Sequence, residues 1–161
     1  MRVRKVVVLA LSLSLAFTLS ACGAGRNAQT GKITQVTDGV DGTINTSGSY
    51  IKVRSFLLVA QPDGSAVVVG SMFNELTGPE DLLAISVGDK IATLSKTTYP
   101  LTANQPLHFS GDSANAKAVI LGLNAASGTR VQVKIFFSHA GEMDLNAIVR
   151  DRSGIYSGVT A

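Results

Sequence analysis

The sequence predicts an all-β fold, built as a single antiparallel β-sandwich. Apolar and polar residues alternate along 131–137 and again along 143–149, and a period of two places one set of side chains on a core face. Short β-rich segments recur along the chain with turn residues between them, a pattern typical of sandwiches. No window of the sequence shows a long apolar stripe of helical period.

Residues 1–21 have the features of a secretory signal peptide. Three basic residues lie within the first five positions, an apolar run covers 6–18, and the small residues Ser20 and Ala21 come just before Cys22. This order is typical of a leader with a small-residue cleavage site. The alternative is a transmembrane helix, but the apolar run is shorter than the roughly 20 residues that a span needs.

The segment 19–22, Leu-Ser-Ala-Cys, resembles the lipobox of bacterial lipoproteins. The resemblance implies cleavage before Cys22, a diacylglycerol on its sulfur, and a protein held at the extracytoplasmic face of the cell membrane. Cys22 is the only cysteine of the chain, so its acylation would leave no thiol for a disulfide.

Charge argues against a nucleic-acid partner. The chain has 14 Lys and Arg and 11 Asp and Glu, but three of the basic residues belong to the leader. The remaining side chains therefore balance to zero, without the basic excess that nucleic-acid or anionic-lipid binding requires.

We expect four parts along the chain: a signal peptide at 1–21, a lipidated N-terminus with a flexible tether at 22–48, the sandwich at 49–152, and a C-terminal tail at 153–161. Gly, Asn, Thr and Ser dominate the tether, as in flexible spacers. Whether residues 33–45 add a strand to the sheet stays open. The tail is small and polar, and we expect it to fray.

Within the sandwich, each element follows from its own residues. The segment 50–73 predicts a hairpin, because Pro62-Asp63-Gly64 is a typical turn. A second hairpin is predicted at 130–149, with its turn at 138–141. Between the hairpins we expect short strands at 82–87, 90–94, 107–109 and 118–123, with loops at 76–81 and over most of 97–112.

Four short motifs occur in the order found in a known family: 66–74, ending in Ser-Met-Phe-Asn; 80–83, Glu-Asp-Leu-Leu; 119–124, ending in Gly-Leu-Asn; and 133–142, ending in Phe-Ser-His-Ala-Gly-Glu. In this order the chain resembles the periplasmic PCuAC-like copper chaperones, and more closely their actinobacterial lipoprotein branch. The resemblance implies a cupredoxin-like or immunoglobulin-like sandwich over about 50–150.

The copper ligands implied by this resemblance do not match. The family binds Cu(I) with His and Met, but the positions of its late His-x-Met are Lys117 and Val119 here, and 89–100 contains neither residue type. A relocated site would use His139 and Met143 at the second hairpin, with His108 as a further ligand. The simpler interpretation is a surface histidine at each position and a core methionine.

Catalysis is not expected. No nucleophile elbow, phosphate loop or dinucleotide fingerprint is present. The carboxylates to consider are Glu80, Asp81 and Asp151, and each lies in a polar turn where we expect a solvated charge. The sequence thus favours a non-catalytic binding or accessory module at the cell envelope, presenting loops such as 79–81 and 95–113 to a protein or cell-wall partner. The alternative is a copper chaperone.

Overall fold

The computed structural model describes residues 38–46 and 48–161, which all belong to one compact unit. The leader, Cys22 and most of the expected tether lie outside the described residues. Apart from a 3-10 turn at Gly154–Tyr156, the described residues form strands and loops, and among them no helix is long and apolar enough to cross a membrane. The strands are β1 (Val40–Asn45), β2 (Tyr50–Ala60), β3 (Ala66–Asn74), β4 (Asp81–Val87), β5 (Lys90–Ile91), β6 (Thr93–Leu94), β7 (Tyr99–Pro100), β8 (Leu107–His108), β9 (Ala118–Ile120), β10 (Arg130–Phe137) and β11 (Gly141–Asp151).

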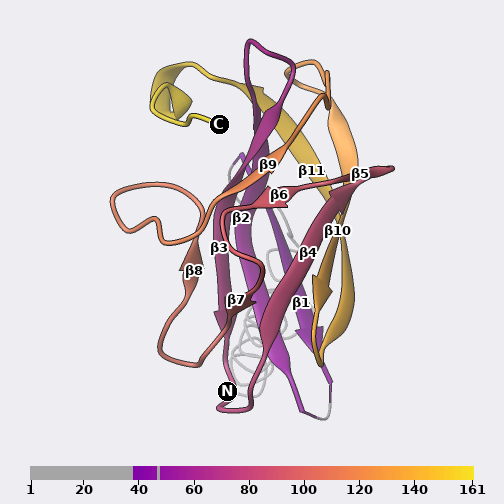
Figure 1. The fold of residues 1–161 in the computed structure, drawn as a ribbon, viewed down its shortest axis with the longest axis vertical. Coiled ribbons are helices and arrows are strands. Elements are labelled where there is room, and N and C mark those ends of the chain that lie inside the picture. Colours follow the sequence, from indigo (N-terminus) through magenta and orange to yellow (C-terminus); the bar gives the residue numbers. More distant parts are fainter. Residues whose placement is uncertain (1–37, 47) are drawn as a thin grey trace, which may run out of the picture. The chain divides into compact units, whose positions relative to one another are not determined.

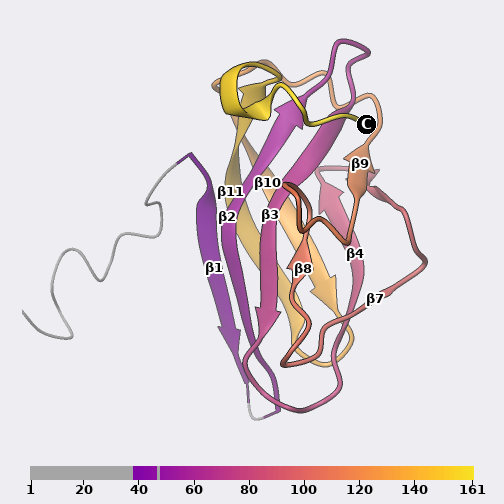
Figure 2. The ribbon, with the colours of Figure 1, turned by 90° about the vertical axis from the view of Figure 1, so that its left-hand side faces the viewer.

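These strands form two layers of a sandwich, which confirms the predicted fold class (Figures 1 and 2). One layer contains β1, β2 and β3 with the short strands β8, β9 and β6 at its edge, and the other contains β11, β10 and β4 with β5 and β7. The pairings are antiparallel with one exception: β11 runs parallel to β2, with Val149 opposite Leu58. This parallel pair joins the two layers.

The core lies between the layers and follows the alternation of the sequence. In the last hairpin, the residues predicted to face inward are Val131, Val133, Ile135, Phe137, Met143, Leu145, Ala147 and Val149. All of them are buried except Val131, which is partly buried against the same cluster. The two largest fully buried side chains are Tyr99 and Phe56, and both belong to this core. The sheet therefore carries a single main apolar interior, as alternation predicts.

Part of the segment 33–45 does add a strand to the sheet, namely β1. Residues 40–45 pair antiparallel with the first half of β2, so the sheet begins within the segment expected to be tether. The Asp41 carboxylate fixes this strand by accepting hydrogen bonds from the Arg54 guanidinium, at 2.7 Å, and from the Ser55 amide, at 2.8 Å.

The C-terminal tail is packed, not frayed. The Tyr156 hydroxyl donates a hydrogen bond to Asp38 at 3.1 Å, and Tyr156 and Val159 pack on a second apolar cluster formed by Leu57, Val59 and Val69. These three residues lie on the outer face of β2 and β3. Because both faces of these strands are apolar here, the outer face needs a cover. The expectation of a frayed tail was wrong because its composition does not show this requirement.

Candidate functional site

Glu80 ends the loop between β3 and β4, and its carboxylate is buried, with 3% of the residue exposed. One oxygen accepts hydrogen bonds from the Ser49 hydroxyl at 2.7 Å and the Ala140 amide at 2.8 Å. The other accepts from the Ser138 hydroxyl at 2.7 Å and the His139 amide at 2.8 Å. A single side chain thus holds the β10–β11 turn against the start of β2.

The environment keeps Glu80 ionised. Burial raises the pKa of the carboxyl, but the hydrogen bonds from His139, Ser138, Ser49 and Ala140 together outweigh burial and lower the pKa to about 2. The expectation of a solvated turn carboxylate was therefore wrong for this residue. A carboxylate held so far below neutral pH, with its oxygens occupied, is a structural anchor and is poorly suited to proton transfer.

His139 lies in the turn above this carboxylate, and its side chain is 61% exposed. Its Nδ1 is 2.9 Å from the Ser138 hydroxyl. That hydroxyl has one proton, which it gives to Glu80, and it also accepts from the Asp81 amide at 2.9 Å. The histidine therefore donates from Nδ1, and in the neutral ring Nε2 carries the lone pair.

The other two predicted ligands lie elsewhere. His108, on β8, bonds through Nδ1 to the Ser71 hydroxyl at 2.8 Å and contacts the Phe73 ring edge-on. Met143 is 5% exposed and belongs to the main core. Within the described residues, no group of three or more His, Cys, Asp or Glu side chains could hold a metal ion.

In the region where the family resemblance places copper ligands, the Tyr99 side chain links two segments of the chain by hydrogen bonds. The Tyr99 hydroxyl is hydrogen-bonded to the Ser95 hydroxyl and accepts from the Lys117 amide at 3.2 Å. The Ser95 amide donates to the Lys117 carbonyl at 3.1 Å, and the Lys96 ammonium lies 5.4 Å from the centre of the Tyr99 ring. The backbone of Lys117 is therefore held next to Ser95, while Lys96 follows Ser95 in the chain, so that two lysines lie close to one serine.

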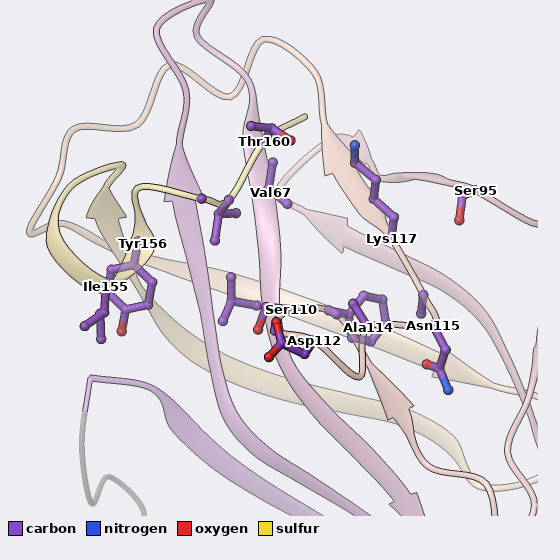
Figure 3. A pocket seen from close by; sticks show the side chains of 16 residues that line it. Val67, Ser95, Ser110, Asp112, Ala114, Asn115, Lys117, Ile155, Tyr156 and Thr160 are labelled. Carbon is purple, nitrogen blue, oxygen red and sulfur yellow. The ribbon is translucent and has the colours of Figure 1, made fainter.

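Ser95 is part of the lining of two surface hollows. The smaller, of about 430 Å³, is lined by Leu83, Ile91, Ser95 and Lys96 among others. The larger is a groove of about 790 Å³ over the outer face of β3, bounded by the 109–117 loop and the C-terminal tail; Ser95 and Lys117 lie on one side of it and Tyr156 on the opposite side (Figure 3). Ile91 is 72% exposed and Leu83 is 43% exposed. The surface combines exposed aliphatic and cationic groups, as binding surfaces often do.

The comparisons with known proteins bear on the fold. No family model matches the chain, and no curated protein matches it. Among solved structures, the chain is similar to the apo PCuAC domain from PmoF1, with 19% identity and a TM-score of 0.56 over 68% of this chain and 99% of that one. It is also similar to the copper-bound PCuAC domain from PmoF2, with 14% identity and a TM-score of 0.58 over 69% of this chain and 97% of that one. The described domain thus has the cupredoxin-like fold of a PCuAC domain, in agreement with the resemblance seen in the sequence.

Proposed function

We propose that this protein is an exported, lipid-anchored binding module without catalytic activity, which uses a PCuAC-type sandwich to present a surface to an envelope partner. The observation that carries the proposal is the mixed surface around Ser95, where Ile91 and Leu83 are exposed beside Lys96. Two of the polar groups considered for chemistry are engaged in the structure: Glu80 holds a turn, and His108 is bonded to Ser71.

Anchoring through Cys22 is tested by Cys22→Ser. We expect this variant to move from the membrane pellet to the soluble fraction when its native host is fractionated, because two acyl chains hold a protein firmly and a single serine does not. Immunoblotting of the two fractions, with Ser20→Ala as the matched control in the leader, measures the shift. A Cys22→Ser protein that still pelleted would contradict the lipobox interpretation.

Copper handling is the second candidate, and two observations favour it. One of the similar structures is a copper-bound PCuAC domain. In addition, His139 donates from Nδ1 to Ser138, beside the Glu80 carboxylate at 3.7 Å, and a metal-binding histidine commonly donates its other N–H to such a partner. A single imidazole is nevertheless a weak site for Cu(I), which prefers several soft ligands.

A Cu(I) titration against a chromogenic chelator under reducing conditions separates the two candidates. From the binding-module proposal we expect the protein to compete poorly, and we expect His139→Ala and Met143→Leu to change little. Met143→Leu is chosen because it preserves the volume of this core position. Stoichiometric binding that survives Met143→Leu but is lost in His139→Ala would overturn this expectation and establish a relocated copper site.

A further inference from the structure

We propose that the surface centred on Ser95 binds an extended peptide segment of a partner protein, with carboxylates at its centre and apolar side chains on both sides. This inference rests on the proposed function, and it names the partner chemistry of that surface. Its basis is the way the two hollows, the two lysines and the exposed aliphatic side chains are arranged around one residue.

Ser95 lines both hollows, so they lie side by side at this residue. The smaller hollow lies against β4 and β5, whereas the larger groove lies over β3. The direct path between them crosses Ser95, which follows β6 next to the β6–β9 pair, in which Leu94 is opposite Ala118. An extended chain suits such a path better than a compact ligand, because it can place successive side chains in separate depressions.

Charge selects the centre of the ligand. Lys96 follows Ser95 in the chain, Lys117 is bonded to Ser95 through the backbone, and neither lysine forms an ion pair with any described carboxylate. No carboxylate lines the smaller hollow, and Asp112, the one that lines the groove, lies apart from Ser95 and Lys117 (Figure 3). A ligand segment that crosses Ser95 therefore gains from negative charge, which steers association and fixes register.

Apolar contacts select the two ends. In the smaller hollow, Leu83 and Ile91 present aliphatic surface to solvent. In the groove, the tail already covers Val67 and Val69, and the aliphatic surface left to solvent is that of Ile155, which is 85% exposed. Burying such surface contributes about 25 cal/mol per Å², so apolar side chains at both ends of the peptide would supply affinity while the central carboxylates supply orientation.

The test is a selection from a displayed random peptide library on the immobilised full chain in detergent. We expect enrichment of peptides with acidic residues between apolar ones. A synthetic peptide of the enriched sequence is then titrated by fluorescence anisotropy against the wild type and the double variant Lys96→Gln/Lys117→Gln. Because this variant removes the two unpaired cations next to Ser95, where we place the carboxylates of the ligand, we expect binding to weaken by about tenfold or more at low salt.

The matched control is Lys52→Gln/Lys134→Gln, which removes the same charge from two lysines that already pair with Glu75 and with Glu142 and Asp144. We expect it to change binding little, and Ile91→Ser to weaken binding without lowering the melting temperature. Enrichment of basic peptides, no enrichment, or equal loss in the control would overturn the proposal. The proposal would also be overturned if no peptide bound and Lys96 and Lys117 were instead required for dimer formation or for binding to phosphatidylglycerol vesicles.

These outcomes are separable from a failure of the proposed function. The proposed function itself would be contradicted if anchoring did not depend on Cys22, or if the protein bound Cu(I) tightly at His139. A failed peptide selection on a chain that still anchors through Cys22 would remove only this occupant of the surface.

Discussion

Replacing Glu80 with Gln is expected to destabilise the protein by about 3 kcal/mol at neutral pH, because it leaves buried donors without a full acceptor. Both Glu80 oxygens accept: one from Ser49 and Ala140, the other from Ser138 and His139. An amide has only one oxygen, and its NH₂ group would face two donors. The turn between β10 and β11 should therefore loosen first.

Glu80 should also make the free energy of unfolding depend on pH in the acidic range. The pKa of Glu80 falls from 4.5 to about 2 on folding, so the unfolded chain takes up the proton first as the pH drops. The stabilisation is complete above the unfolded pKa and is lost as the pH falls from about 5 toward 2. Integrated over this window, the shift corresponds to roughly 3 kcal/mol.

Urea unfolding of the wild type and Glu80→Gln at pH 7, 5 and 3 measures both effects. We expect the stability gap between the two proteins to be largest at pH 7 and to shrink toward pH 3. Glu75→Gln is the matched control: it removes a neighbouring loop carboxylate whose ion pair with Lys52 is largely exposed, and such pairs contribute little. A gap that stayed constant with pH would contradict the assignment of the acid dependence to Glu80.

Glu80 also shows what the sequence could not predict. Its donors lie 31 to 60 positions away along the chain, and no local pattern reports contacts of that range. The alternation along 143–149, in contrast, depends only on neighbouring residues, and it correctly placed Met143 in the core. The same limit applies to the parallel pairing of β11 with β2, because alternation marks a buried face but not the direction of the neighbouring strand.

The candidate site, too, was only partly predictable from the sequence. Sequence comparison by motif order identified Lys117 and Val119 as departures from a copper site, since those positions carry no soft ligand. It could not show that Lys96 and Lys117 both contact Tyr99 and lie close to Ser95, because these contacts depend on how β6 and β9 pair. The charges of the side chains outside the leader balance to zero. The structure adds that two lysines without an ion-pair partner, Lys96 and Lys117, share one surface.

The bulge in β2 is the remaining feature that sequence patterns missed, and it determines the second large effect. Ser55 has a φ of +50°, and the register of β2 shifts here against both β1 and β3. β1 pairs with residues 50–53 of β2 and, across the bulge, with Phe56, whereas β11 pairs with residues 58–60. The bulge therefore lies where β2 changes partner between the two layers, in keeping with the role of bulges in bending strands.

Gly70→Ala is expected to cost about 3 kcal/mol, because Gly70 supports this bulge from the side of β3. Its φ is +136°, and an added Cβ would lie 2.9 Å from the Arg54 carbonyl oxygen and 3.1 Å from the Phe56 Cα. These are backbone atoms, which cannot move aside as the end of a side chain can. The methyl group would push β3 away from β2 at the point where the strand bends.

The variant Gly128→Ala measures the cost of a positive φ without a steric contact, and so separates this strain from the close backbone contact at Gly70. Gly128 has a φ of +88°, but an added Cβ there would meet nothing within 4 Å, so we expect a cost of about 1 kcal/mol. Thermal and urea unfolding of both variants measures the difference. Equal costs would mean that strain alone governs both positions and that β3 tolerates a methyl group against β2. A larger cost at Gly70 would show that the joining of the two layers depends on this backbone contact.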